Sequence, residues 1–449
     1  MNSYFATQAL LPHGWEHNVR ICVDNGSIVE VQPDSKGGEP LAGPVLPGMA
    51  NLHSHAFQRA MAGLTEVRGT PEDDFWSWRE LMYRFLERLT PEHAQAIARQ
   101  LYVEMLKSGY TAVAEFHYVH QDPAGKPYAD PAEMLMRHLA AATETGIAIT
   151  LMPSLYSWSN LGAKPLQPRQ ARFRTGVSEI LALVETARSH VSKDVNVGVA
   201  PHSLRAVGPD ALKELTSTLD KQMPIHIHAA EQTKEVDDCI AALGKRPVEW
   251  LLENHRLDGR WCVVHATHIT LEETRGLAAS GAIAGLCPTT EGSLGDGIFP
   301  LLAFRAAGGR YGIGGDSHVS RDPVEELRLL EYVQRLTARK RNLVVTEKNP
   351  GVGTTLWLEA AAGGAQALGR VMGAIAPGKR ADLVVLDSQH PDLQEKSGDA
   401  IANALVFSGS AGLVRDVMVA GRWVVAARRH EAEESAAAAY RKCVKELLA

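Results

Sequence analysis

Two histidines separated by one residue are the first candidates for metal chemistry in this chain. His53 and His55 flank Ser54 at the end of the apolar segment 46–53. Successive side chains of a strand alternate between its two faces, so both imidazoles would project to the same side and could reach one ion. Such a pair is common without a metal, so further ligands on neighbouring segments are needed to support the interpretation.

A second histidine pair is followed by an acid. His226 and His228 alternate along another short apolar segment, and Glu231 comes three residues after His228. A neutral imidazole binds divalent ions, and a carboxylate beside an open coordination position can move protons. Both histidines share a face, and the position of His228 nearer the end of the segment favours it as the ligand. Taken alone, Glu231 is also explained as an acid at the start of a helix.

His265 and Asp316 each close a further apolar segment. A carboxylate is costly to bury unless it is paired or bound to a metal, although Asp316 could instead cap a helix and His265 could be a satisfied core histidine. The occurrence of all these elements in order on successive segments indicates one metal centre. The predicted ligands are His53, His55, His228 and Asp316.

Three imidazoles and one carboxylate suit zinc, with a water molecule completing the coordination. We expect one Zn²⁺ per subunit, with Fe²⁺ and Mn²⁺ as alternatives. The cysteines are scattered and contain no CxxC pair, so neither a disulfide framework nor a cysteine-rich zinc site is expected, and a reducing cytoplasm fits best. These cysteines are Cys22, Cys239, Cys262, Cys287 and Cys443.

The elements that would position these residues repeat along the chain. Short β-branched runs alternate with amphipathic segments such as 91–107, 209–221 and 271–279, a pattern that predicts the α/β class and a closed (β/α)8 TIM barrel. The polar residues fall at the carboxyl ends of the runs, which form the rim that carries active sites in such barrels. The predicted strands are 46–53, 110–117, 147–155, 195–202, 224–228, 261–265, 281–287 and 310–316.

The two ends of the chain have a different pattern. Residues 1–46 and 375–430 contain short alternating runs joined by Gly, Asp and Pro turns, including 21–23, 27–31, 383–386 and 414–419. They predict one small β-sandwich domain built from both ends. Residues 47–374 would form the metal-dependent barrel, and residues 431–449 a terminal helix.

Composition and charge restrict the partners. The formal charge is −6, from 46 Lys and Arg against 52 Asp and Glu, which argues against a nucleic-acid surface. There is no apolar run of about 18 residues and no secretory leader pattern, so neither a membrane nor export is expected. We expect a cytoplasmic enzyme acting on a small molecule. We also expect a homodimer, although no motif fixes the oligomeric state.

The motifs resemble those of the amidohydrolase superfamily. Residues 46–55 are similar to its first-strand signature, and residues 373–384 are similar to the turn at which such chains re-enter their β-sandwich. The order HxH, HxxE, His, Asp resembles the mononuclear deaminase branch, and no lysine suited to a carbamylated metal bridge was found. The resemblance implies zinc-dependent hydrolysis that releases ammonia from a C=N carbon.

Within that branch, residues 53–64, 76–84, 114–120 and 202–207 resemble the family of deiminases that act on N-formimino-L-glutamate in histidine degradation. Planar guanidinium groups bind carboxylates bidentately, which suits this dicarboxylate. By position alone, Arg79 could be a surface helix residue, and Arg205 could be a loop residue in a salt bridge. The resemblance implies that the substrate is held by Gln58, Arg79, Tyr118, His202 and Arg205.

The implied mechanism assigns acid–base roles to Glu231, His265 and Asp316. Glu231 would take a proton from a metal-activated water and pass it to the imino nitrogen. His265 and Asp316 would orient the water, and one of them would carry the second proton, giving N-formyl-L-glutamate and ammonia. The alternatives are a nucleobase or nucleoside deaminase, a triazine-type chlorohydrolase, an inactive barrel used as a scaffold, and a structural zinc site.

Overall fold

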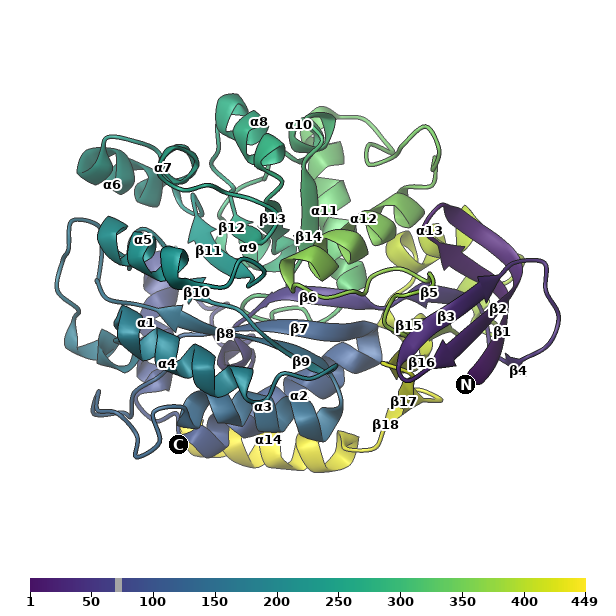
Figure 1. Ribbon diagram of the computed structural model, residues 1–449, viewed down its shortest axis with the longest axis horizontal. Helices are drawn as coiled ribbons and strands as arrows, with labels where there is room; N and C mark the ends of the chain where they lie inside the picture. The colour runs from purple at the N-terminus through teal and green to yellow at the C-terminus, as the bar shows by residue number, and fades with distance from the viewer. Residues whose placement is uncertain (69–74) are drawn as a thin grey trace.

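A ring of parallel strands forms the larger part of the computed structural model, which describes residues 1–68 and 75–449 (Figure 1). Each strand is short, apolar and buried along most of its length. The strands are β6 (Met49–Ser54), β7 (Tyr110–His117), β8 (Ala148–Leu155), β9 (Val195–Val197), β10 (Ala200–Pro201), β11 (Ile225–Ala229), β12 (Trp261–His265), β13 (Ile283–Leu286) and β14 (Arg310–Ile313).

Hydrogen bonds join these strands into a closed order. β6, β7 and β8 pair in parallel, β9 and β10 both pair with β8, and β11 to β14 pair in sequence. Isolated parallel bridges between Val199 and Ile225 and between Ser54 and Asp316 connect the two sets. The ring therefore has eight strand positions, the fourth shared by β9 and β10, and the predicted parallel α/β architecture is confirmed.

Helices follow most of the strands. For α2, Thr90 caps the first turn by accepting from His93 N, Pro91 stands at the first helical position, and Gly109 ends the helix with φ 103°. The helices are α1 (Phe75–Leu86), α2 (Pro91–Ser108), α3 (Glu133–Thr145), α4 (Val177–Arg188), α5 (Pro209–Thr218), α6 (Thr233–Leu243), α7 (Pro247–Asn254), α8 (Leu271–Ser280), α9 (Pro288–Leu294), α10 (Leu301–Ala306), α11 (Pro323–Ala338), α12 (Val352–Ala367), α13 (Asp399–Phe407) and α14 (Glu433–Leu448), with 3-10 turns η1 (Ala56–Met61), η2 (Pro168–Phe173), η3 (Pro391–Leu393) and η4 (Ala411–Leu413).

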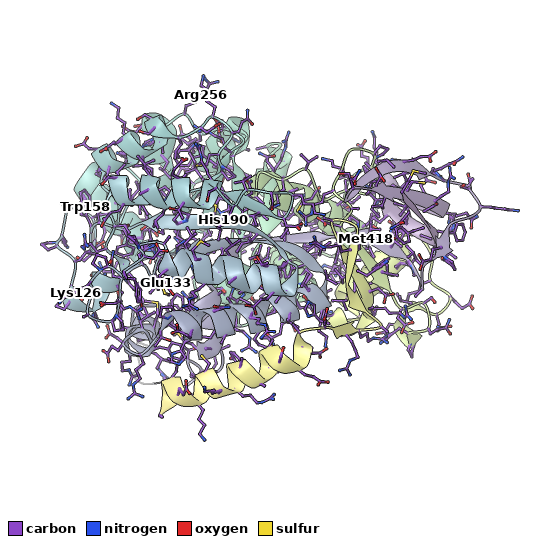
Figure 2. The ribbon with its side chains drawn as sticks, turned by 60° about the horizontal axis from the view of Figure 1, so that its bottom comes forward. Lys126, Glu133, Trp158, His190, Arg256 and Met418 are labelled. Atoms are coloured by element: carbon purple, nitrogen blue, oxygen red, sulfur yellow. The ribbon has the colours of Figure 1, made fainter. Side chains whose placement is uncertain are left out.

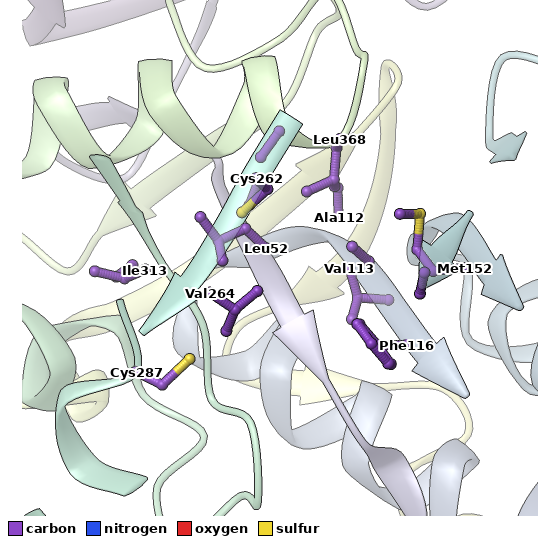
Figure 3. Packing of buried hydrophobic residues seen from close by; sticks show 14 of the residues in the cluster. Leu52, Ala112, Val113, Phe116, Met152, Cys262, Val264, Cys287, Ile313 and Leu368 are labelled. Carbon is purple, nitrogen blue, oxygen red and sulfur yellow. The ribbon is translucent and has the colours of Figure 1, made fainter. Parts of the chain in front are cut away.

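Apolar side chains fill the middle of the ring. Figure 3 shows Leu52, Val113, Phe116, Val264 and Ile313 from four of the strands packed together, and all of them are fully buried. Because this core is closely packed, ligands cannot pass through the ring. Polar chemistry is therefore confined to the rim at the carboxyl ends of the strands.

Both ends of the chain meet in a second, antiparallel-rich sheet beside the ring (Figure 1). Leu46 pairs with Val384, so a strand that precedes the ring lies next to one that follows it. The nine strands form one hydrogen-bonded sheet, so its division into two layers stays a prediction. The strands are β1 (Asn2–Leu11), β2 (Gly14–Asp24), β3 (Ser27–Gln32), β4 (Glu39–Pro40), β5 (Val45–Pro47), β15 (Leu383–Leu386), β16 (Val414–Val419), β17 (Arg422–Ala426) and β18 (Arg429–His430).

The prediction that residues 375–430 contain short strands alone is wrong for residues 391–413. This stretch contains η3, α13 and η4. α13 packs against α11 and α12, and Arg328 Nε of α11 donates to the Val406 carbonyl oxygen (2.6 Å). The helix covers an apolar face of the ring helices, a tertiary role that local sequence patterns do not reveal.

The terminal helix α14 lies along the outside of α2, as Figures 1 and 2 both show. Figure 2 also shows the small sheet as a lobe around Met418, at the far end of the molecule from Lys126 and Trp158. The helix predicted for residues 431–449 is found at Glu433–Leu448. Among the described residues, none of the helices has the length and apolar character needed to cross a membrane.

Candidate active site and metal centre

Four side chains from three strand ends converge at the rim. His53 Nε2 lies 3.2 Å from His55 Nε2 and 3.0 Å from His228 Nε2. Asp316 Oδ1 lies 3.4 Å from His55 Nε2 and 3.7 Å from His53 Nε2. The structure therefore brings together all four residues that the sequence analysis proposed as ligands, although they are separated by up to 263 positions in the sequence.

The donor atoms fit a divalent ion. Zinc–nitrogen bonds of about 2.0–2.1 Å place neighbouring ligand atoms about 3.0–3.4 Å apart, which matches the spacing of these imidazoles. The Nδ1–H groups of His55 and His228 donate to the carbonyl oxygens of Phe116 (2.7 Å) and His202 (2.8 Å). This arrangement leaves the Nε2 lone pairs pointing at one another, which is unfavourable unless a cation lies between them.

The position of His226 resolves the alternative that the sequence left open. His226 Nε2 donates to the Ala367 carbonyl oxygen (2.8 Å), so this ring is held by the main chain and is not one of the clustered ligands. Cys287 lies near His265 and Asp316. Burial raises the pKa of the Cys287 thiol well above its ordinary value.

Burial controls the protonation of the candidate ligands. Desolvation lowers the pKa of His53 and His228 well below the ordinary value, and that of His55 to about 3. Desolvation also raises the pKa of Asp316 to about 7, against the opposing effect of His265. The three imidazoles are therefore neutral near pH 7, which is the form that binds metal.

Several residues at the same rim have strained backbone conformations. Ala230, His265, Ala266, Asp316 and His318 have φ between 48° and 67° without being glycine. This left-handed region is unfavourable for residues with a Cβ and is found preferentially at functional sites. The bends lie just after β11, at the end of β12 and after β14, and they turn the side chains into the rim.

Acid–base groups adjoin the four candidate ligands. His265 Nε2 lies 3.6 Å from Asp316 Oδ2 and 3.8 Å from Glu231 Oε1, and His265 Nδ1 lies 3.2 Å from Glu291 Oε1. Burial alone would lower the pKa of His265, but the three surrounding carboxylates raise it to about 10. A carboxylate, that of Glu231, and a basic imidazole, that of His265, therefore lie together beside the cluster.

The five residues that the resemblance assigned to substrate binding line one cavity with His55, His228, Glu231, His265 and Asp316. Gln58 Nε2 donates to Tyr118 Oη (2.8 Å), and Arg79 Nη2 donates to Tyr83 Oη (2.7 Å). Arg205 Nη2 donates to Glu231 Oε2 (3.3 Å). The cavity therefore has a metal-type cluster on one wall and two guanidinium groups, those of Arg79 and Arg205, close by.

Two carboxylates at the site, those of Glu291 and Glu235, were not among the residues predicted from the sequence. Glu291 contacts His265, and Glu235 accepts from the backbone N–H groups of Ala230 (3.2 Å) and Glu231 (3.0 Å). Glu291 follows the seventh predicted strand, so the signal used for the other strand ends could have found it. Glu235 stands in the first turn of α6, where an acid is ordinary.

Comparison with known proteins places the chain in a family. The model of the amidohydrolase family matches residues 45–424. A second model, described as the N-terminal domain of formimidoylglutamate deiminase HutF, matches residues 1–40. The chain therefore belongs to the amidohydrolase family.

Individual relatives agree with this assignment. The chain is 54% identical to the formimidoylglutamate deiminase of Pseudomonas aeruginosa over the full length of both chains. It is 30% identical to a 5-methylthioadenosine/S-adenosylhomocysteine deaminase of Natronomonas pharaonis, covering 90% of this chain and 86% of the relative.

Solved structures show the same fold. An amidohydrolase from Brucella melitensis has a TM-score of 0.95 at 45% identity, with full coverage of both chains. A zinc-bound adenosine deaminase from Xanthomonas campestris has a TM-score of 0.82 at 21% identity, covering 99% of this chain and 98% of the other. At that identity the second likeness concerns the fold alone.

Proposed function

We propose that the protein hydrolyses N-formimino-L-glutamate to N-formyl-L-glutamate and ammonia, a step of L-histidine degradation. The carrying observation is that the cavity with two guanidinium groups adjoins the cluster of His53, His55, His228 and Asp316. The full-length 54% identity to a formimidoylglutamate deiminase supports the same activity. A head with a C=N carbon and a tail with two carboxylates matches the two chemistries of the cavity.

The metal in this proposal is one Zn²⁺ per chain, held by His53, His55, His228 and Asp316, with Fe²⁺ or Mn²⁺ as substitutes. The donor set and the Nε2 spacings fit such an ion. When bound, the ion supplies Lewis acidity, which makes a water nucleophilic at neutral pH.

Glu231 is the proposed proton carrier. Its carboxylate faces the cavity 3.8 Å from His265 and 3.3 Å from Arg205. It takes a proton from the attacking water and delivers it to the departing nitrogen, so that ammonia leaves as a neutral group. His265 is held as an imidazolium by Glu231, Glu291 and Asp316, and its charge stabilises the negative charge that develops during attack. Either His265 or Asp316 carries the second proton.

The proposed substrate contacts use a buried oxygen of Gln58 and the charged guanidinium groups of Arg79 and Arg205. Gln58 Oε1 is buried and accepts no hydrogen bond from the described residues, so it can accept one from an N–H of the formimino group. Arg79 and Arg205 bind the carboxylates, while Tyr118 and His202 line the same cavity beside the substrate. Positioning of this kind converts binding energy into favourable reaction geometry.

Proposals on the fold, the location and the partners accompany this activity. The ring is a (β/α)8 barrel, as expected for the family, and the nine-stranded sheet curls into a β-sandwich around the apolar cluster that includes Ile21, Leu383 and Met418. The enzyme acts in the cytoplasm, as a homodimer, on a small dicarboxylate and on neither nucleic acid nor membrane.

A nucleobase or nucleoside deaminase is the alternative function, because relatives at about 30% identity include 5-methylthioadenosine/S-adenosylhomocysteine and 8-oxoguanine deaminases. A panel assay separates the two. Ammonia release is measured for the zinc-loaded protein with N-formimino-L-glutamate, guanine, 8-oxoguanine and adenosine. We expect turnover of N-formimino-L-glutamate at least a hundredfold above the others, whereas preferential turnover of a purine would refute the proposal.

A further inference from the structure

Two adjacent residues of β7 hold three consecutive residues around the HxH pair. Ser54 Oγ donates to Glu115 Oε2 (2.6 Å), His55 Nδ1 donates to the Phe116 carbonyl oxygen (2.7 Å), and Ala56 N donates to Glu115 Oε1 (2.8 Å). The carboxylate of Glu115 thus binds the chain on both sides of His55. This arrangement fixes the backbone from which one candidate ligand projects.

Ser54 extends the connection to β14. Its Oγ lies 2.9 Å from His318 Nε2. A hydroxyl has one proton, and Ser54 gives it to Glu115, so His318 must be the donor in the second contact. His318 stands two residues after Asp316, and Asp316 N donates to the His53 carbonyl oxygen (2.9 Å). Ser54 therefore joins the strand of two candidate ligands to the loop of a third.

These groups are deeply buried and lie behind the site. Ser54 and His318 are fully buried, and Glu115 is 1% exposed. Ser54 alternates with His53 and His55 along the strand, and Glu115 also accepts from Tyr102 Oη of the surrounding helix α2 (3.1 Å). None of the three lines the substrate cavity. Their effect on the reaction must therefore pass through the ligands that they hold.

We propose that Glu115, Ser54 and His318 form a positioning unit that fixes the separation between the His53–His55 pair and Asp316, and so sets how tightly and in what geometry the metal is held. The inference rests on the metal centre of the proposed function. Partners that orient metal ligands commonly account for a 10- to 100-fold change in metal affinity when they are removed.

The test compares metal binding by apoproteins, and it needs no substrate. Ser54→Ala removes both hydrogen bonds and leaves His318 Nε2 without its acceptor. We expect its zinc dissociation constant, measured by competition with a chromophoric chelator, to rise about 10- to 100-fold. We also expect the ligand-field bands of the Co²⁺-substituted protein to shift, because the geometry around the ion changes. Ser54→Thr keeps the hydroxyl and should restore both readouts.

Substitution of Thr354, which lies in α12 and far from Ser54 in the sequence, provides a matched control. Its Oγ1 donates to Asp399 Oδ1 (2.6 Å) and accepts from Trp15 Nε1 (3.1 Å), so it repeats the hydrogen-bond arrangement of Ser54 between α12, α13 and the small sheet. Thr354→Ala is expected to lower the thermal midpoint of the apoprotein while leaving the zinc dissociation constant and the cobalt spectrum unchanged. It therefore separates loss of stability from loss of positioning.

The outcomes are distinct. A Ser54→Ala protein with a zinc dissociation constant within twofold of the wild type and an unchanged cobalt spectrum overturns the proposal, as does an equal loss of affinity in Thr354→Ala. If Ser54→Ala does not fold, Glu115→Gln, which keeps the size and one acceptor oxygen, takes its place. Failure of the wild type to bind one zinc or cobalt ion would instead refute the metal centre itself.

Discussion

The Glu231 carboxylate lies between the guanidinium group of Arg205 and the imidazole ring of His265. Arg205 Nη2 is 3.3 Å from one carboxylate oxygen, and His265 Nε2 is 3.8 Å from the other. Substrate binding at Arg205 would compete with its contact to Glu231 and free that carboxylate oxygen for the reaction. At the scale of single residues, the account therefore depends on Glu231 as a mobile proton carrier rather than as a ligand.

Replacing Glu231 by glutamine tests this role. The amide keeps the size of the side chain but cannot accept a proton from water, so we expect kcat to fall about 10²- to 10⁴-fold. Zinc content, measured by atomic absorption, should stay at the wild-type value because Glu231 is outside the proposed donor set. Glu331→Gln is the control, because Glu331 is fully buried and paired with Arg335 away from the site. Near-normal turnover in Glu231→Gln would remove its proton-transfer role.

The candidate ligands could be predicted because each stands at a strand end and has a side chain that is unusual in an apolar setting. Histidine spacing did not decide between His226 and His228; the contact of His226 with the Ala367 carbonyl did. Ser54, Glu115 and His318 could not be predicted as a unit, because a serine or a glutamate in a strand has no distinctive pattern. Their relation exists only once β6, β7 and β14 are adjacent.

At the scale of elements, the close approach of α12 to β14 depends on a glycine. Gly363 lies in α12 where a Cβ would overlap the backbone carbonyl group of Tyr311 on β14. Only a residue without a side chain lets the helix and the strand approach so closely. Since β14 leads directly to Asp316, this packing also determines where that carboxylate lies.

Gly363→Ala is therefore expected to push α12 away from β14. Overlap with backbone atoms cannot be relieved by a change of rotamer, so we expect a loss of about 3 kcal/mol or more in the free energy of unfolding. Gly276→Ala in α8 is the control, because its Cβ would meet the end of the flexible Leu252 side chain. Urea denaturation monitored by fluorescence measures both, and equal midpoints for Gly363→Ala and wild type would contradict the packing argument.

A buried histidine cluster lies between β7 and α3. The ring centroid of His117 is 4.9 Å from that of His120 and 5.5 Å from that of His138, and Glu115 Oε1 is 3.8 Å from His138 Nδ1. Burial lowers the pKa of His120 and of His138 to about 4, although His120 donates to the Ser154 carbonyl oxygen. The unfolded chain therefore binds more protons than the folded protein between about pH 6.5 and 4.

The contribution of these two histidines to stability should consequently fall as the pH decreases through this window, and it should be fully present above pH 6.5. Each such histidine contributes about 1.4 kcal/mol per pH unit. The free energy of unfolding, measured with urea at pH 7 and pH 5, should decrease between these two pH values. We expect this decrease to be about 2 kcal/mol smaller for His138→Gln than for the wild type. An identical pH dependence in both proteins would show that His138 is not held neutral by burial.

Element boundaries illustrate what local patterns can and cannot give. The run 110–117 is a strand with the same bounds in the structure, because its apolar, β-branched residues are buried throughout. The run 195–202 is split into β9 and β10 at Gly198 and Val199. α13 was missed because its apolar face is matched to α11 and α12, elements that lie far away in the sequence.

At the scale of the whole molecule, the two ends of the chain meet because the strands just before and after the ring pair with each other. β5 (Val45–Pro47) leads directly into β6 and pairs with β15, so the small sheet is anchored next to the first strand of the ring. The turn-rich segments at both ends of the sequence predict this meeting. One continuous hydrogen-bonded sheet could not be predicted, because strand order depends on contacts between distant segments.

The central claim is that one divalent ion, held by residues from three strands, is required for release of ammonia from N-formimino-L-glutamate. Titration of the apoprotein with Zn²⁺ while ammonia release is recorded tests it most directly. The account predicts no turnover without metal, a linear rise to one zinc per chain and a plateau beyond that point. Turnover by metal-free protein, or activity that continues to rise to two ions per chain, would contradict it.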